Sequence, residues 1–178
     1  SPHKADDLNA LAANSGGRIT VIGIDVRDED SVRAAAAGVG DLDLVVCNAG
    51  TLNARGGLTD PGHTPENIAE SLMTNIAGVF FTARHFAGHL KGSAAPRIAV
   101  ISSQMGSSER AGTTSPIYRA TKAAATNLVR SIALELADDG IAVGAYHPGW
   151  VQTDMGGAEA AITVEESAKG LLQRFAAL

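Results

Sequence analysis

The chain reads Arg97-Ile98-Ala99-Val100-Ile101-Ser102-Ser103 near its middle, a short apolar run that ends in two serines. Such a run is typical of a strand that is buried on both faces of a parallel sheet. Similar runs at 18–24, 42–47 and 141–146 alternate with longer helical patterns. This alternation predicts an α/β fold built from parallel βαβ units, with helices on both faces of the sheet.

The helical patterns carry apolar residues at three- and four-residue spacing. They predict helices over 4–13, 28–37, 64–89, 117–136 and 164–175. We expect Asp28 to cap the second helix and Thr64-Pro65 to begin the third. The Thr163-x-x-Glu166 spacing predicts a capping box on the last. No repeat or linker interrupts the pattern, so residues 1–178 are expected to form a single domain.

Composition excludes several classes of protein. The 178 residues are 45% hydrophobic, which is ample for a packed core, and the net charge of -5 with no basic stripe makes nucleic acid an unexpected partner. No apolar run approaches the roughly 18 residues of a membrane span, and residues 1–10 lack the apolar stretch of a signal peptide. We therefore expect no membrane partner and a cytoplasmic location. The single cysteine, Cys47, has apolar neighbours and is expected to be a buried hydrophobe.

Polar or turn-forming residues follow each predicted strand. They are Asp25, Asn48, Ser102 with Ser103, and Pro148-Gly149. In a parallel α/β sheet, ligands bind beyond the carboxyl ends of the strands. We expect these residues to meet at one edge of the sheet and to form a site there.

Tyr118 and Lys122 are four residues apart in a predicted helix and therefore share one of its faces. A nearby ammonium group can lower the pKa of a phenol and make it usable as an acid or base. The spacing alone also fits an ordinary amphipathic surface. Its position beside the strand ends favours a catalytic interpretation.

Other chemistries are less well supported. His85 and His89 are four residues apart, but Phe86 stands where a zinc protease has Glu and no third ligand is suggested, so we expect no metal site. The Gly-x-Ser-x-Gly turn of serine hydrolases is not found.

Several motifs occur together in one order along nearly the whole chain. They are Asp25-Val26, Asn48-Ala49-Gly50, Asn75 within 73–78, Ile101-Ser102-Ser103, Tyr118-x-x-x-Lys122, and Pro148-Gly149 with Val151 and Thr153. In this the chain resembles the short-chain dehydrogenase/reductase family. Residues 146–157 are most similar to its carbonyl-reductase-like branch, which includes the insect sniffer protein and bacterial C-factor. The resemblance implies a Rossmann-like, doubly wound parallel sheet.

The resemblance also implies an NAD(P)-dependent oxidoreductase that transfers a hydride between nicotinamide and a carbonyl or alcohol substrate. Tyr118 would be the general acid/base, and Lys122 would lower its pKa and bind the nicotinamide ribose. Asn75 would hold the water of a proton relay. Ser103 would bind the substrate oxygen; strand alternation favours it over Ser102. Because Ser103 lies fifteen rather than thirteen residues before Tyr118, Ser107 remains a competitor.

The remaining motifs would hold the cofactor, with NADP preferred to NAD. Asp25 and Val26 would contact the adenine, and Asn48, Ala49 and Gly50 would line the cleft. Pro148 and Gly149 would complete the nicotinamide side, where Val151 and Thr153 contact the carboxamide. Substrate contacts would come from loops 51–63, 104–117 and 154–163. The family also implies a homodimer or homotetramer formed through the helices over 64–89 and 117–136.

One expected motif is not found. The 24 residues before Asp25 contain no Gly-x-x-x-Gly-x-Gly, so the first βαβ portion is absent and the sheet is expected to be incomplete at its N-terminal side. Two interpretations follow. The first is an oxidoreductase of which these 178 residues are a part. The second is a truncated, cofactor-free scaffold or interaction subunit that pairs its open sheet with another chain.

Overall fold

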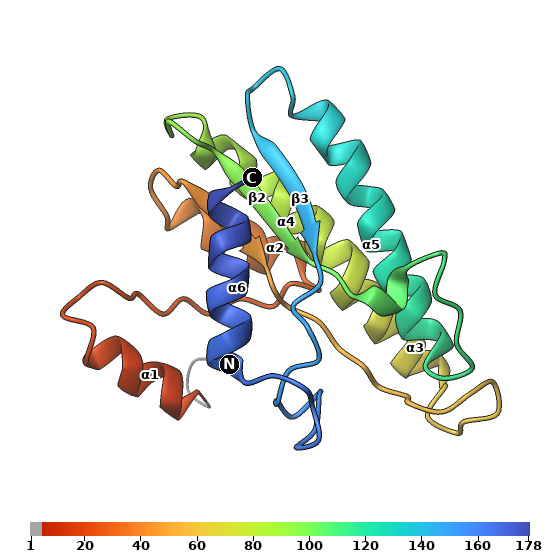
Figure 1. Ribbon diagram of the computed structural model, residues 1–178. Coiled ribbons are helices and arrows are strands. Elements are labelled where there is room, and N and C mark those ends of the chain that lie inside the picture. The colour runs from red at the N-terminus through yellow and green to blue at the C-terminus, as the bar shows by residue number, and fades with distance from the viewer. Residues whose placement is uncertain (1–4) are drawn as a thin grey trace.

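The computed structural model describes residues 5–178. At its centre lies a parallel sheet of three strands in the order β1 (Leu44–Cys47), β2 (Arg97–Ile101) and β3 (Ala142–Tyr146) (Figure 1). The register aligns Leu44 with Arg97, and Arg97 with Ala142. This confirms the predicted α/β class and the parallel sheet.

Helices cover both faces of this sheet. One face carries α2 (Glu29–Ala37), α3 (Pro65–Leu72), α4 (Gly78–Phe86) and α5 (Pro116–Glu135), whereas α6 (Val164–Ala176) lies on the other (Figure 1). Alternate residues of β2 serve the two faces, because successive side chains of a strand point to opposite sides. Ile98 and Val100 join the larger core with α4 and α5, and Ala99 and Ile101 pack with Phe175 of α6. The helix α1 (Asp6–Ala13) buries no residue.

The predicted helix starts have the expected caps. Asp28 accepts a hydrogen bond from the backbone N–H of Asp30, and Thr64 accepts one from Asn67. Thr163 and Glu166 form a reciprocal capping box on α6. These local predictions are confirmed, because a cap depends only on residues within one turn of the helix.

The predicted helix over 64–89 is continuous but not uniform. Between α3 and α4 lies the π-helical turn η2 (Met73–Ala77), and α4 is followed by the 3-10 turn η3 (Ala87–Leu90). Single π turns within α-helices often occur at functional sites. Here the turn contains Asn75, whose side chain is fully buried.

The prediction of a strand over 18–24 is wrong. Residues 18–24 form no strand, and Ile19, Ile22 and Ile24 are 36–43% exposed. A strand needs a neighbouring backbone to pair with, and no ladder with this segment is seen within residues 5–178. The segment is instead anchored at its end, where Val26 packs so closely on α4 that a Cβ at Gly78 would lie 2.9 Å from Val26 Cγ2. The first helix was predicted over residues 4–13, and residue 4 lies outside the residues that the structure describes.

Candidate active site

The sheet brings the residues that follow its three strands to one edge; Asp25 is not among them, because residues 18–24 form no strand. Asn48 follows β1, Ser102 and Ser103 follow β2, and His147 follows β3. The loop after β2 passes through the 3-10 turn η4 (Gln104–Gly106) and meets α5 at very close range. A Cβ at Gly106 would lie 2.6 Å from the carbonyl carbon of Lys122, so only glycine allows this approach.

Tyr118 lies in the first turn of α5, directly beside Ser103. The two side chains form a hydrogen bond, and Ser103 Oγ also accepts the N–H of Met105 at 3.1 Å. Burial raises the pKa of Tyr118, and the Ser103 hydrogen bond offsets part of this rise. The predicted lowering of this pKa by Lys122 is thus opposed by burial, which acts in the other direction.

Lys122 is only 4% exposed, and its ammonium group lies at the end of β2. Its Nζ donates to the carbonyl oxygen of Ile101 at 2.8 Å and lies 5.7 Å from the centre of the Tyr118 ring. Burial lowers the pKa of Lys122 to about 8. No acidic side chain forms an ion pair with it among the residues that the structure describes. Burial therefore favours the neutral amine over the ammonium form of Lys122.

Asn75 connects three parts of the site. Its Oδ1 accepts the N–H of Thr51 at 2.9 Å, and its Nδ2 donates to the Thr51 carbonyl oxygen at 3.0 Å and to Thr121 Oγ1 at 2.9 Å. A Cβ at Gly50 would lie 3.3 Å from Lys122 Nζ and 3.5 Å from Asn75 Oδ1. Asn75, Gly50 and Lys122 therefore lie together, and Asn75 fixes the loop after β1 against α5.

The other serines have different surroundings. Ser102 is buried, where its Oγ donates to the Lys122 carbonyl oxygen at 3.1 Å and lies 2.7 Å from Thr126 Oγ1. Ser107 is exposed and accepts the N–H of Glu109. Only Ser103 is hydrogen-bonded to Tyr118, so the geometry favours Ser103 over both Ser102 and Ser107.

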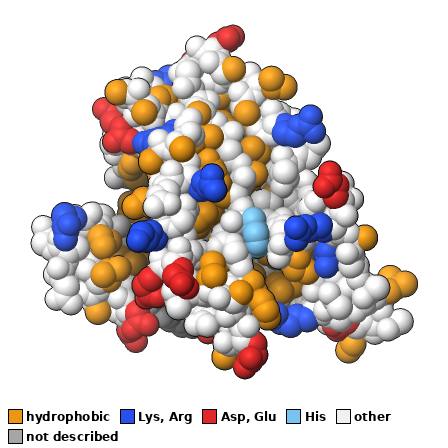
Figure 2. Space-filling view, viewed as in Figure 1, with side chains coloured by type: hydrophobic (Ala, Val, Ile, Leu, Met, Phe, Trp, Pro, Cys, Tyr) orange, Lys and Arg blue, Asp and Glu red, His pale blue; other side chains and the backbone are white. Residues whose placement is uncertain are grey.

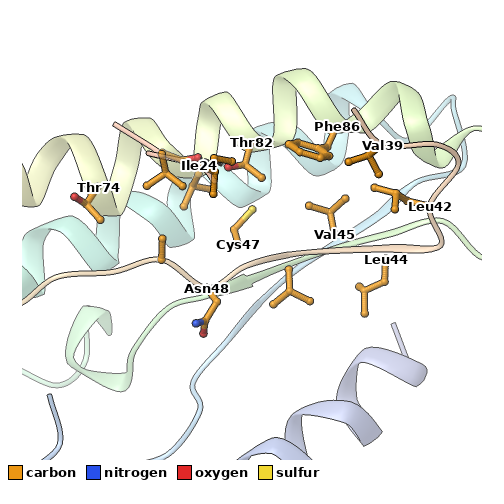
Figure 3. Close-up of a pocket in the computed structure, with 15 residues that line it drawn as sticks. Ile24, Val39, Leu42, Leu44, Val45, Cys47, Asn48, Thr74, Thr82 and Phe86 are labelled. Atoms are coloured by element: carbon orange, nitrogen blue, oxygen red, sulfur yellow. Dashed lines mark hydrogen bonds between the residues drawn. The ribbon is translucent and has the colours of Figure 1, made fainter. Parts of the chain in front are cut away.

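An apolar groove of about 380 Å³ runs between β1, α4 and residues 24–26. Figure 3 shows Val45 and Cys47 pointing toward Thr82 and Phe86 of α4, whereas Asn48 points to the opposite side of the chain. Three of the predicted cofactor residues, Val26, Asn48 and Ala49, line this groove. Burial raises the pKa of the Cys47 thiol to about 12, which agrees with the predicted role of a buried hydrophobe.

Asp25 is an exposed residue with a strong local partner. Its carboxylate accepts from the N–H and the Nε of Arg27, both at 3.0 Å, and from Arg27 Nη2 at 2.9 Å. These bonds lower the pKa of Asp25 to about 2. Asp25 is thus an ionised carboxylate that forms an ion pair with Arg27.

The segment after β3 is folded back onto α6. Pro148 accepts a hydrogen bond from Ser167 Oγ at 2.7 Å, and Gly149 has a φ of 94°, which favours glycine. Val151 forms an isolated parallel bridge with Ile162. Thr153 Oγ1 accepts the N–H of Gly156 at 3.0 Å, which closes a short turn.

Hydrogen bonds connect three loops near Tyr118, and the sequence did not predict these contacts. Arg55 Nη2 donates to the Met155 carbonyl oxygen at 2.8 Å. Ser115, just before α5, donates from its N–H to the Gly56 carbonyl oxygen at 2.8 Å. Loop 51–63 is therefore hydrogen-bonded to both of the loops over 104–115 and 147–163. No residue-type pattern in the sequence indicates these pairings, since the partners are far apart along the chain.

Groups of metal ligands and membrane-spanning helices are also absent from residues 5–178. In the described part of the chain, no three His, Cys, Asp or Glu side chains are grouped as metal ligands, and His85 instead pairs with Glu29 at 3.0 Å. None of the helices within residues 5–178 has the length and apolar character needed to cross a membrane.

Comparison with known proteins places the chain in a family. The profile of the family described as short chain dehydrogenase matches residues 2–162. The cis-4-hydroxycyclohexanecarboxylate dehydrogenase of Sinomonas cyclohexanicum is 34% identical over 85% of this chain, which spans only 61% of that relative. The structure of the NADPH-bound carbonyl reductase from chicken fatty liver superposes with a TM-score of 0.87 at 31% identity, covering 98% of this chain and 75% of that one. For the carbonyl reductase Sniffer of D. melanogaster the TM-score is 0.90 at 26% identity, covering 100% and 78%. The fold is therefore Rossmann-like, and this chain belongs to the short-chain dehydrogenase family.

Proposed function

We propose that this protein is an NAD(P)-dependent oxidoreductase that interconverts a small carbonyl compound and its alcohol, as the EC 1.1.1 class does. The observation that carries the proposal is the hydrogen bond between Tyr118 and Ser103 beside the buried ammonium of Lys122. A phenol, a hydroxyl and an ammonium group at the strand ends form a proton-transfer site.

In this proposal Ser103 and Tyr118 bind the substrate oxygen. Tyr118 donates its proton to the carbonyl oxygen during reduction and takes it back during alcohol oxidation. Burial favours the neutral phenol over the phenolate, and the neutral phenol is the form that donates a proton. Lys122 lies close enough to stabilise the phenolate that remains, and Asn75 holds the surrounding loop in place. When bound, the nicotinamide nucleotide supplies or accepts the hydride.

The proposed cofactor residues fit a nucleotide in part. Asn48, Ala49 and Gly50 are exposed, so their backbone is accessible to a ligand. Val26 lines the apolar groove and could pack on a base, with Asp25 beside it. Pro148, Gly149, Val151 and Thr153 would form the nicotinamide side. We propose NADP in preference to NAD, supported by the NADPH bound to the chicken carbonyl reductase.

Nucleotide binding by the full-length protein is the direct test. Trp150 is the only tryptophan and lies in the loop after β3, so its fluorescence reports on the proposed nicotinamide side. We expect saturable quenching by NADPH, weaker quenching by NADH, and oxidation of NADPH in the presence of some members of a carbonyl panel. No quenching by either nucleotide, together with no turnover of any carbonyl, would contradict the proposal.

The scaffold interpretation is less favoured. The open edge of β1, where Val46 is 40% exposed, would suit pairing with another chain. However, the residues of the proposed proton-transfer site are all present and assembled, which a scaffold does not require.

The proposal also covers the domain organisation, the oligomeric state and the location of the protein. We propose one domain over 1–178 and a homodimer or homotetramer through α3, α4 and α5, supported by the exposed apolar residues Leu72, Phe80 and Leu134. We also propose a cytoplasmic location, where a free thiol such as that of Cys47 stays reduced. Size-exclusion chromatography of the full-length protein at micromolar concentration is expected to give a dimer or tetramer, and a monomer alone would contradict the interface.

A further inference from the structure

The guanidinium group of Arg110 is hydrogen-bonded to the segment after β2, and its charge acts on the residue that follows β3. Arg110 belongs to the loop between η4 and α5, and its Nη1 donates to Gln104 Oε1 at 2.9 Å. Gln104 directly follows Ser103. On the other side, His147 follows β3, and its pKa is lowered by burial and by the positive charge of Arg110. Arg110 therefore lies at the mouth of the proposed active site.

The loop that carries Arg110 is tied to the start of α5. Arg119, the neighbour of Tyr118 in the sequence, donates from Nη1 to the Arg110 carbonyl oxygen at 3.1 Å and from Nε to the Thr114 carbonyl oxygen at 2.9 Å. The Arg110 side chain is exposed to solvent, whereas its backbone is held in place. A ligand that enters the mouth could reach it without a rearrangement of the loop.

The positive charge at this mouth is not balanced by acids. Every ion pair within residues 5–178 involves other elements, such as Arg84 with Glu29 or Lys91 with Asp139. Arg55, Arg110 and Arg119 donate instead to neutral carbonyl or amide oxygens. In the view of Figure 2, Lys and Arg side chains lie on either side of a histidine near the centre, and Asp and Glu side chains lie farther out.

The acids of the same loops do not offset this charge by direct contact. The Asp60 carboxylate accepts the backbone N–H groups of Gly56 and Gly62. Neither Glu109 nor Asp154 forms an ion pair among the described residues. In a chain with a net charge of -5, this leaves a local positive site at the proposed catalytic edge.

A guanidinium that is oriented by a neutral acceptor keeps its charge and its remaining donors for a ligand. Carboxylates match its planar donor geometry and form two parallel hydrogen bonds with it. We propose that Arg110, with His147 beside it, binds an anionic group of the substrate, so that the preferred substrates are carbonyl or hydroxy acids. This inference rests on the proposed function, because it places the acid group within reach of Ser103 and Tyr118.

A phosphate group of the nucleotide has related chemistry and could use the same guanidinium. The two sources are separable, because a simple aromatic acid carries the carboxylate without the nucleotide. Benzoate and benzamide form a matched pair of similar size that differ in charge. The aldehydes 4-carboxybenzaldehyde and its methyl ester form the corresponding pair for turnover.

The experiment measures benzoate and benzamide binding to the full-length protein by calorimetry, with and without NADP. The variants are Arg110→Gln and Arg110→Lys, and Arg33→Gln on the exposed face of α2 is the matched control. A hydrogen bond to a charged group contributes about 1.5–3 kcal/mol, so we expect Arg110→Gln to weaken benzoate binding by roughly tenfold or more. The benzoate affinity of Arg110→Lys should lie between those of wild type and Arg110→Gln. Arg33→Gln should bind benzoate as wild type does, and the affinity for benzamide should not change in any variant.

Turnover adds the second readout. Arg110→Gln should raise KM for 4-carboxybenzaldehyde but not for its methyl ester. The inference is overturned if wild type does not bind benzoate, if Arg110→Gln binds it as wild type does, or if the variant loses affinity for NADPH alone. If no carbonyl is reduced while benzoate binding still depends on Arg110, the proposed function fails and the anion site stands.

Discussion

Replacement of Tyr118 by Phe is expected to lower kcat/KM for carbonyl reduction by roughly 10²–10⁴-fold, the usual contribution of a positioned general acid. The substitution removes only the hydroxyl that is hydrogen-bonded to Ser103 and leaves the ring in the space beside Lys122. The proton for the carbonyl oxygen must then come from water. The measurement is NADPH oxidation by the full-length protein with its best carbonyl substrate.

The chain offers a matched control for this substitution. Tyr146 is the only other tyrosine, and its ring packs edge-on against Phe175 with centroids 5.1 Å apart. Tyr146→Phe keeps this contact and should change kcat/KM by less than about threefold, since it touches none of the proposed reacting groups. The assignment of Tyr118 would be wrong if both variants lost activity equally, or if Tyr118→Phe kept most of it. Quenching of Trp150 by NADPH should persist in Tyr118→Phe, which separates loss of chemistry from loss of binding.

The proposed catalytic residues could be located from the sequence because each depends on a short-range rule. The side chains of Tyr118 and Lys122 share a helix face whatever the rest of the fold does. Ser103 follows an apolar run that is recognisable as a strand, and strand ends converge in a parallel sheet. Caps such as Asp28 and the Thr163–Glu166 box were predictable for the same reason, since their partners lie within one turn.

What could not be predicted depends on partners far apart in the sequence. The run over 18–24 has the composition of a buried strand, yet a strand also needs a neighbour, and composition says nothing about whether one is present. The hydrogen bonds of Asn75 to Thr51 and Thr121 connect residues that are 24 and 46 positions apart. The Arg55 contact with Met155 spans 100 positions.

The relation between Lys122 and Tyr118 is the most instructive difference. Helical spacing brings the two side chains close, and proximity alone predicts that the ammonium lowers the pKa of the phenol. Burial acts in the opposite direction on both groups, because it disfavours the charged form of each. The sign of a pKa shift thus depends on desolvation, which spacing does not report.

The burial of Lys122 leads to a stability prediction with a definite sign. Its pKa falls from 10.5 to about 8 on folding. Between these two pH values the unfolded chain binds a proton that the folded chain does not, so the free energy of unfolding rises with pH. Below about pH 8 both states are protonated and the full penalty is present. A shift of this size corresponds to about 3 kcal/mol, so we expect Lys122→Met to remove a pH-dependent change of that order.

The measurement is urea unfolding of wild type, Lys122→Met and the exposed-lysine control Lys169→Met at several pH values between about 7.5 and 10.5. The variant also leaves the Ile101 carbonyl oxygen without its donor, but this cost is the same at every pH. The readout is therefore the slope of the stability difference, not its absolute value.

Tyr118 and Tyr146, whose pKa values burial raises, titrate in all three proteins, so their effects largely cancel in the difference. Below about pH 8, the free energy of unfolding of Lys122→Met should exceed that of wild type by the largest amount. This difference should shrink by about 3 kcal/mol by about pH 10.5. The stability of Lys169→Met should follow the same pH dependence as that of wild type. Parallel curves for Lys122→Met would mean that the ammonium is solvated in the folded protein. A slope of the expected sign would mean that the fold keeps a destabilising, unpaired cation beside Tyr118, and catalysis then provides the reason for keeping it.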